Sequence, residues 1–248
     1  MLHGSHSKYP VHLDVFQRED ALSFYLLGVF LTDGNIDRLS GHKHDLYRVG
    51  LTSADEDWLK LIRDLISPLR PIWKRKDQKT RRMEIANQDL ARWLLSWGCH
   101  ERKSLTVEFP IGVPEEYLPD CVRGVFDGDG SLTVCDYRKV KNGKVYIYPR
   151  VNAYICSGSY RFITGLQHRL KLAGFSPSMF EAKKKENSII RSDKTLRTIR
   201  AGVTWRLQLA DQSAAPFLQW MYYPGNPLAM PRKAALARKA LDILCGKQ

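Results

Sequence analysis

The spacing of apolar residues predicts the same order of elements in each half of the chain. In the first half, apolar residues fill residues 21–27 and then recur at helical spacing over residues 58–66 and from about Asn87 to Gly98. Between these helices, strands are predicted at residues 45–53, 72–76 and 81–86. The first half therefore predicts the order helix, strands, helix, strands, helix.

The second half repeats this order after an apolar stretch at residues 116–123. Strands are expected at residues 144–148, 150–157, 175–182 and 203–210, with Pro149 marking an edge, a bend or a bulge. One helix runs from about Phe162 to a cap at Gly174, and another begins at Asp211. Two basic insertions, near residues 138–144 and 186–202, are expected as loops. A last helix, roughly Arg232 to Leu244, has no long counterpart in the first half.

A seven-residue phrase occurs once in each half, at the end of the first apolar stretch. The copies are Gly-Val-Phe-Leu-Thr-Asp-Gly at residues 28–34 and Gly-Val-Phe-Asp-Gly-Asp-Gly at residues 124–130. Gly28 and Gly124 lack a Cβ, so two helices can approach closely at these positions. Such a helix interface would bring Asp33 and Asp129 together at the helix ends. Two adjacent carboxylates require a cation, so the repeat predicts a metal site on a pseudo-twofold axis.

At this phrase the chain resembles the LAGLIDADG homing endonucleases in their single-chain form, which carries two copies of the motif. Residues 122–130 match the nine-residue motif of that family closely. Residues 26–34 depart from it at the sixth position, where Leu31 replaces the usual acid. The family's metal ligand is the acid at the eighth position, and both copies retain it. The resemblance extends from about Asp14 to Leu244.

The resemblance implies an α/β (α+β) fold built from two pseudosymmetric αββαββα halves. The halves would pack through their paired LAGLIDADG helices, and their saddle-shaped antiparallel sheets would bind DNA. We expect a tail at residues 1–13, an N-terminal half at 14–98, a linker at 99–114 and a C-terminal half at 115–248.

Composition supports a polyanionic partner. The chain has 39 lysines and arginines against 26 acids, giving a net charge of +13, and this excess in a globular chain favours nucleic acid. The five cysteines are scattered without metal-ligand spacing and predict reduced thiols in an intracellular protein. We expect it in the cytoplasm or nucleoid, or in an organelle that encodes it. No apolar run reaches transmembrane length.

The candidate catalytic residues lie at equivalent positions of the two halves. Asp33 and Asp129 are the expected metal ligands, assisted by the backbone carbonyls of Thr32 and Gly128. Asp127 is expected to face solvent or DNA and has no metal role. The resemblance implies that Lys103 and Lys233, just after the last helix of each repeat, approach the reacting water and phosphate; ordinary solvated charge is the alternative. Ser53 and Ser157, at strand ends, are expected to order solvent.

Candidate DNA-binding residues lie on the predicted strands and their turns. In the first half they are Arg48, Lys74, Arg75, Lys76, Lys79, Arg81 and Arg82. In the second half they are Arg138, Lys139, Lys141, Lys144, Arg150, Lys183, Lys184, Lys185, Arg191, Arg197, Arg200 and Arg206. Aromatic residues, Tyr137, Tyr146 and Tyr148 among them, interleave with these cations. Because a two-stranded ribbon fits the major groove, alternate side chains can reach bases or phosphates.

Together these features predict a monomeric, site-specific DNA endonuclease that serves intron or intein-like homing. It would make a metal-dependent, staggered double-strand cut in a long, non-palindromic target. Magnesium is the expected cofactor; manganese is expected to substitute, and calcium to support binding without efficient cleavage. The alternative is the same fold used without cleavage, as an intron RNA maturase or a DNA-binding regulator. Retention of Asp33 and Asp129 favours the nuclease.

Overall fold

The computed structural model describes residues 9–39, 46–74, 79–183, 187–190, 196–199 and 203–246. Its N-terminal half contains α1 (Asp14–Gln17), α2 (Ala21–Thr32), β1 (Gly34–Leu39), β2 (Leu46–Ser53), α3 (Glu56–Ile66), β3 (Trp73–Lys74), β4 (Arg81–Ile85) and α4 (Gln88–Ser96). Two short 3-10 helices, η1 (Lys103–Leu105) and η2 (Glu115–Tyr117), follow. The C-terminal half contains α5 (Leu118–Asp129), β5 (Gly130–Lys141), β6 (Lys144–Ser157), α6 (Tyr160–Leu172), β7 (Ser178–Lys183), β8 (Asn187–Ile190), β9 (Leu196–Ile199), β10 (Val203–Ala210), η3 (Asp211–Ser213), α7 (Ala214–Met221) and α8 (Pro231–Leu244).

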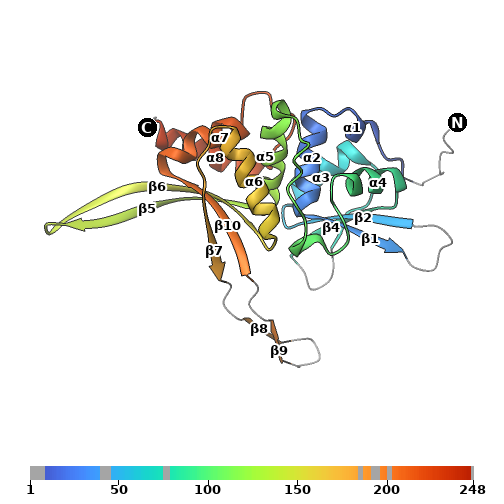
Figure 1. Ribbon diagram of the computed structural model, residues 1–248, viewed down its shortest axis with the longest axis horizontal. Helices are drawn as coiled ribbons and strands as arrows, with labels where there is room; N and C mark the ends of the chain where they lie inside the picture. Colours follow the sequence, from blue (N-terminus) through green and yellow to red (C-terminus); the bar gives the residue numbers. More distant parts are fainter. Residues whose placement is uncertain are drawn as a thin grey trace.

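The two halves carry equivalent antiparallel sheets on one side of a helical layer (Figure 1). The strand orders are β1-β2-β4-β3 and β5-β6-β10-β7, so in each sheet the first two strands form a hairpin that follows the motif helix directly. Apolar residues on one face of the central strands, such as Val49 and Leu51 on β2 and Ile155 on β6, are buried. The predicted fold class, an α/β fold with two antiparallel sheets, is therefore confirmed. None of the helices in the described part of the chain is long and apolar enough to cross a membrane.

The motif helices α2 and α5 lie side by side at the centre of the molecule (Figure 1). Nearly every residue of α2 from Ser23 to Leu31 is buried, because the helix is covered on all sides. A Cβ at Gly28 would lie 2.8 Å from Val125 N and 3.0 Å from Gly124 Cα, and one at Gly124 would lie 3.0 Å from Val29 N. The predicted close approach of the two helices at these glycines is therefore present.

The segment expected as a loop insertion near residues 138–144 is instead the end of a long hairpin. β5 and β6 pair without interruption from Gly130↔Ile155 to Lys141↔Lys144 and project away from the helices (Figure 1). Only Asn142 and Gly143, both with positive φ, remain in the turn. Pro149 lies within β6 opposite Asp136, beyond the part of β6 that pairs with β10, so β6 is an edge strand there, as a proline requires.

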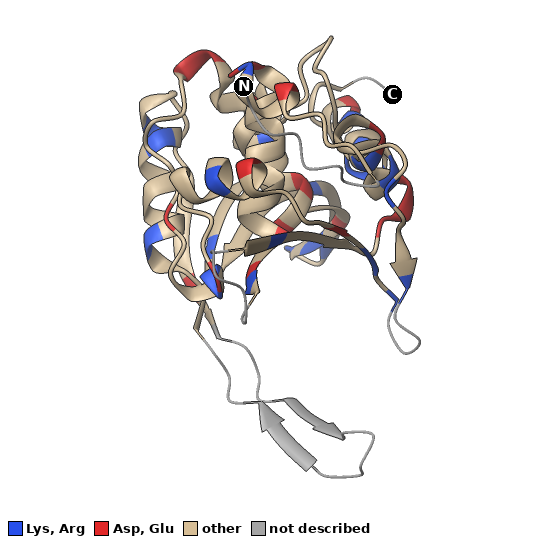
Figure 2. Cartoon of the chain, turned by 90° about the vertical axis from the view of Figure 1, so that its right-hand side faces the viewer, with Lys and Arg blue, Asp and Glu red and all other residues tan. Residues whose placement is uncertain are grey.

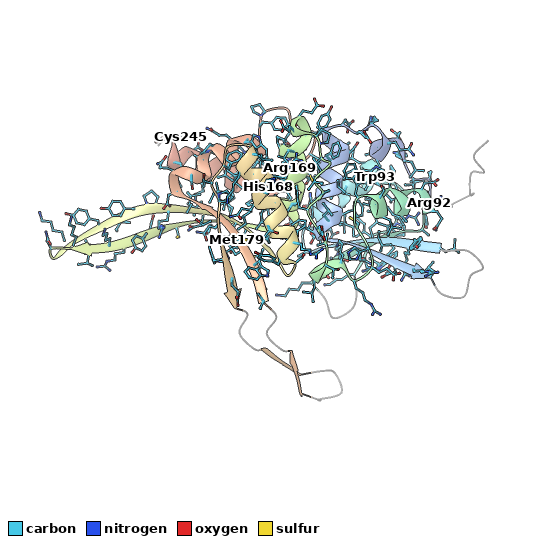
Figure 3. The ribbon with its side chains drawn as sticks, in the orientation of Figure 1. Arg92, Trp93, His168, Arg169, Met179 and Cys245 are labelled. Carbon is cyan, nitrogen blue, oxygen red and sulfur yellow. The ribbon has the colours of Figure 1, made fainter. Side chains whose placement is uncertain are left out.

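The predicted linker, residues 99–114, packs against the C-terminal half. Val107 and Phe109 are buried, and the Phe109 ring lies 5.7 Å from that of Phe162 on α6. Ser159, the N-cap of α6, donates a hydrogen bond of 2.6 Å to the Val107 carbonyl. Figure 3 shows His168 and Arg169 on α6, and Arg169 donates to the carbonyls of this same segment. The domain boundaries themselves stay a prediction.

Candidate active site

The two aspartates of the repeated phrase end the central helices. Asp33 follows α2 as its C-cap, and Asp129 is the last residue of α5; a glycine after each acid opens the next strand. Burial, and then the negative charge of Asp129, raise the pKa of Asp33 from 3.8 to about 7. The charges of Lys233 and Lys103 act in the opposite direction. The charge of Asp129 therefore acts on Asp33 across the interface between the two halves, in accord with the predicted meeting of the two acids.

A cleft of about 490 Å³ opens beside these helix ends and is shared by the two halves. Thr32 and Lys103 line it from the N-terminal side, and Asp129 and Ser157 from the C-terminal side. Within the part of the chain that the structure describes, no three His, Cys, Asp or Glu side chains form a metal-binding group. A cation held here would therefore rely on the two aspartates and on oxygen ligands from backbone, water or substrate.

Lys103 and Lys233 are both buried, with 7% and 5% of their surface exposed. The Lys233 ammonium donates to the carbonyls of Phe126, Asp127 and Gly130 at 2.7 Å and to Gly128 at 3.4 Å. The Lys103 ammonium donates to the carbonyls of Thr32, at 3.3 Å, and of Gly34. Each lysine thus binds carbonyls at the end of its motif helix and at the start of the following strand.

These contacts place both lysines beside the acids and not in open solvent, so the alternative of ordinary solvated charge is wrong. Burial lowers the pKa of Lys233 to about 8 and also lowers the pKa of Lys103. The carbonyls of Thr32 and Gly128, which the sequence suggested as metal ligands, each accept a hydrogen bond from a lysine. Their second lone pair remains for a further partner.

Ser53 and Ser157 have matching local roles. The Ser53 hydroxyl accepts a hydrogen bond of 3.1 Å from the Asp55 amide before α3, and the Ser157 hydroxyl accepts one of 3.1 Å from the Ser159 amide before α6. Ser157 also lines the cleft, whereas Ser53 is buried with 7% exposure. Both serines organise the turn from strand to helix, and the solvent-ordering role stays a prediction.

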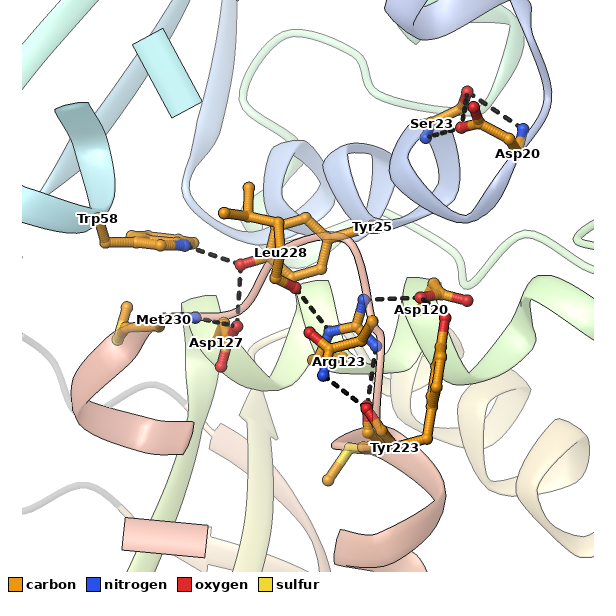
Figure 4. A network of polar contacts seen from close by, with 12 residues as sticks. Asp20, Ser23, Tyr25, Trp58, Asp120, Arg123, Asp127, Tyr223, Leu228 and Met230 are labelled. Atoms are coloured by element: carbon orange, nitrogen blue, oxygen red, sulfur yellow. Dashed lines mark hydrogen bonds and ion pairs between the residues drawn. The ribbon is translucent and has the colours of Figure 1, made fainter. Parts of the chain in front are cut away.

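Asp127 does not face solvent or DNA, and that expectation is wrong. It is fully buried, and its carboxylate accepts hydrogen bonds of 2.8 Å from the Tyr25 hydroxyl, 2.7 Å from the Tyr222 hydroxyl and 2.7 Å from the Met230 amide. Trp58 donates to the Tyr25 hydroxyl at 2.7 Å, so the chain of contacts reaches α3 (Figure 4). Asp127, the motif acid two residues before Asp129, therefore ties α2 to the start of α8, which carries Lys233.

A second buried group that sequence reasoning missed is Arg123, in the middle of α5. Its guanidinium donates to Asp120 at 2.6 Å and to the carbonyls of Met221 and Leu228 at 2.8 Å (Figure 4). The spacing of Asp120 and Arg123, three residues apart on a predicted helix, is the sequence signal that could have shown this pair. Its role is to hold the α7–α8 connection against the motif helix.

The basic residues on the open face of the N-terminal sheet are paired with acids. Arg82 contacts Glu84 at 2.7 Å and Asp37 at 3.5 Å, and Arg48 contacts Glu84 at 3.4 Å and Asp37 at 3.5 Å. Figure 2 shows basic and acidic residues mixed on the side of the molecule that this half occupies. Two further candidates, Lys74 and Lys79, are exposed, whereas Arg81 pairs with Glu56.

The basic residues of the C-terminal sheet are less compensated. Arg138, Lys139, Lys141 and Lys144 are exposed on the β5–β6 hairpin. Arg150 lies 5.1 Å from the Tyr137 ring and pairs with Asp211 at 3.3 Å, and Arg206 stacks 4.2 Å from the Tyr154 ring. The remaining candidates, Arg75, Lys76, Lys184, Lys185, Arg191 and Arg200, lie outside the described residues, and only the backbone is described for Lys183 and Arg197.

Comparison with known proteins identifies the architecture. No family model matches the chain. The DNA-directed RNA polymerase subunit Rpo1C of Methanocaldococcus jannaschii is 22% identical over 196 residues, which are 71% of this chain and 22% of that protein. The chain therefore spans about a fifth of the length of this curated relative.

Solved structures resemble the chain over most of its length. The LAGLIDADG meganuclease I-AabMI, bound to uncleaved DNA, matches with a TM-score of 0.59 and 9% identity, covering 90% of this chain and 91% of that one. I-DmoI in complex with DNA and Ca matches with a TM-score of 0.55 and 16% identity, covering 88% and 97%. I-LtrWI bound to target DNA matches with a TM-score of 0.55 and 11% identity, covering 92% of each chain. The resemblance carried by the two motif copies is thus confirmed at the level of the fold, which is that of the single-chain LAGLIDADG homing endonucleases.

Proposed function

We propose that the chain is a site-specific DNA endonuclease that makes a metal-dependent, staggered double-strand cut. The observation that carries this proposal is the pair Asp33 and Asp129, which end the two packed motif helices. Asp129 lines the cleft between the halves, and its charge contributes to the raised pKa of Asp33. Burial and the nearby charge of Asp129 make the ionised form of Asp33 costly, and a bound divalent cation would offset that cost. Retention of both acids favours a nuclease over a module that only binds nucleic acid.

The residues present fit a hard divalent cation such as Mg²⁺. Carboxylates are its preferred protein ligands, and Asp33 and Asp129 are the acids that would hold it. Bound there, the cation would polarise the attacking water and neutralise charge on the leaving oxygen. The solved I-DmoI complex contains DNA and Ca, which accords with this assignment.

The chain's own cations would act on the scissile phosphate. Lys103 and Lys233 hold positive charge close to both acids while they stay anchored to helix carbonyls. Preorganised charge of this kind stabilises the transition state more than the bound substrate. With its pKa lowered to about 8, Lys233 can also exchange a proton near neutral pH. The Ser157 hydroxyl in the cleft is a candidate to orient a water.

The two open sheet faces would bind the duplex on either side of the cut. Because their side chains differ, each half would read a different sequence, and the target would be long and not palindromic. One chain contains both halves, so a monomer would suffice. We expect cleavage across the minor groove with 3′ overhangs, as the resemblance implies.

The test begins with a plasmid library that carries a randomised 40-base-pair insert, from which bound sites are selected with the wild-type protein in Ca²⁺. Cleavage of a selected plasmid is then measured in Mg²⁺ for the wild type, Asp33→Asn and Asp129→Asn, with the exposed Asp242→Asn as a matched control. Wild type and control should cut both strands, and the two motif variants should bind in Ca²⁺ without cutting. Binding without cleavage in Mg²⁺ or Mn²⁺ by the wild type would support the binding-module alternative.

A further inference from the structure

The described pairing in the two hairpins that follow the candidate metal ligands differs twofold in length. β1 pairs with β2 over six positions, and β5 pairs with β6 over twelve. At about 3.3 Å per residue, the reach from the acid is roughly 20 Å in the N-terminal half and 40 Å in the C-terminal half. The chain also has eight more residues between Gly130 and Ile155 than between Gly34 and Leu51. These eight additional residues allow four more cross-strand pairs in the C-terminal hairpin, even if the N-terminal hairpin were paired along its whole length.

The additional length forms an arm with two different faces. We call residues 135–150 the outer arm. The buried residues Leu132, Val151 and Ala153 identify the face of β5–β6 toward the helices, and alternation continues this face outward. On the outer arm it carries Asp136, Arg138, Val140, Val145, Ile147 and Pro149. The opposite face, here called the saddle face, carries Cys135, Tyr137, Lys139, Lys141, Lys144, Tyr146, Tyr148 and Arg150. Figure 3 shows side chains leaving the hairpin on both sides.

The saddle face has the chemistry of a nucleic-acid surface, and the opposite face does not. Lys139, Lys141 and Lys144 are exposed there, and the rings of Tyr146 and Tyr148 stack in parallel at 6.2 Å. Exposed apolar side chains dominate the other face: Val140 at 65%, Val145 at 47% and Ile147 at 65% exposure. A polyanion would therefore meet the arm from the saddle side, where the two sheets are open.

The sheet with the longer hairpin also carries more positive charge that no acid compensates. On the N-terminal open face, Asp37 and Glu84 pair with Arg48 and Arg82, so four charges compensate one another. On the saddle face of the outer arm no acid occupies a paired position beside the lysines, and Arg150 alone has an acidic partner, Asp211. Exposed and uncompensated lysines release more counterions on binding DNA than arginines already held in ion pairs.

We propose that the saddle face of the outer arm binds the duplex beyond the reach of the N-terminal sheet. The C-terminal half-site is then longer by about four to six base pairs, at 3.4 Å per base pair, and contributes the larger share of the salt-dependent affinity. This inference rests on the proposed function, because it takes duplex DNA as the ligand of both sheets. The reach of each hairpin is counted from its acid, Asp33 or Asp129, because each hairpin begins directly after that residue.

Two neighbouring cations on opposite faces provide a matched test. Lys139 and Arg138 are adjacent and both are exposed, but Arg138 lies on the face away from the saddle, so the structure removes it from the DNA-binding candidates of the sequence. Binding of a selected duplex is measured in Ca²⁺ as a function of KCl concentration for the wild type, Lys139→Gln and Arg138→Gln. Lys139→Gln should reduce the slope of log K against log salt by about 0.9, and Arg138→Gln should leave it unchanged. Equal changes for the two variants would overturn the face assignment.

Footprinting tests the length of the half-site. Hydroxyl-radical protection around the cleavage position should extend four to six base pairs farther on one side than on the other. Replacing residues 136–149 with Asn-Gly closes a shorter hairpin, and should withdraw protection on that side alone. Circular dichroism and a urea melt confirm that this variant is folded. A wild-type protein that binds and cuts DNA with equal protection on both sides refutes this inference and leaves the proposed function standing; failure to bind any duplex refutes both.

Discussion

Asp33→Asn should stabilise the metal-free protein in a pH-dependent manner. The pKa of Asp33 is about 7 in the folded chain against an ordinary value of 3.8. The folded protein therefore binds more protons than the unfolded chain between these values, so the stability contributed by this carboxyl is present at low pH and is lost as pH rises through 7. A difference of about three pH units corresponds to about 4 kcal/mol, which the ionised acid costs the folded state at pH 8. Asparagine keeps the shape and removes that cost.

The measurement is urea unfolding of the wild type and Asp33→Asn in EDTA at pH 4 and at pH 8. Relative to the wild type, the free energy of unfolding of the variant should rise little at pH 4 and by up to about 4 kcal/mol at pH 8. Saturating Ca²⁺ should reduce the difference in free energy of unfolding between the variant and the wild type at pH 8, because a cation that binds the two carboxylates stabilises the wild type selectively. Asp242→Asn, an exposed acid on α8, controls for the loss of one charge from the whole chain.

An Asp33→Asn variant that unfolds at the same or a lower urea concentration than the wild type at pH 8 in EDTA would show that ionised Asp33 costs the folded protein nothing. The carboxylate would then be stabilised in the folded protein by groups other than a divalent cation. The same pH-dependent gain in the free energy of unfolding for Asp242→Asn would also refute this prediction, because the effect would then follow net charge and not the meeting of the two acids.

Three further outcomes are expected. Gly28→Ala and Gly124→Ala should each destabilise the fold by about 3 kcal/mol or more in urea melts, because the new Cβ meets the backbone of the facing helix, whereas Gly112→Ala should be tolerated. Lys103→Ala and Lys233→Ala should slow cleavage in Mg²⁺ by about 100-fold while Ca²⁺-supported binding falls little; equal losses would make the lysines phosphate clamps. Asp127→Ala should cost about 3 kcal/mol or more, since it leaves two tyrosine hydroxyls and the Met230 amide without an acceptor, and wild-type stability would refute that network.

The sequence by itself determined the features that depend on local pattern and on the repeat. Apolar periodicity indicated the helices and most strands, since a helix or strand must bury one side whatever its partner. The repeated glycine indicated the close helix pair, because only a missing Cβ permits that approach. The repeated Asp-Gly indicated that the two acids would meet, because equivalent positions on paired helices meet at the axis.

Tertiary structure alone decided which polar groups are buried and what they contact. Asp127 and Asp129 are two residues apart in the same motif, yet one is sealed among Tyr25, Tyr222 and Met230 and the other lines the cleft. The pairing of Arg48 and Arg82 with Asp37 and Glu84 depends on strand register, because only register brings these side chains onto one face. Residues 138–144, at the tip of the outer arm, were expected as a loop because they have no buried face to impose alternation. Partners distant in sequence supply burial and register, and these are what a local pattern does not contain.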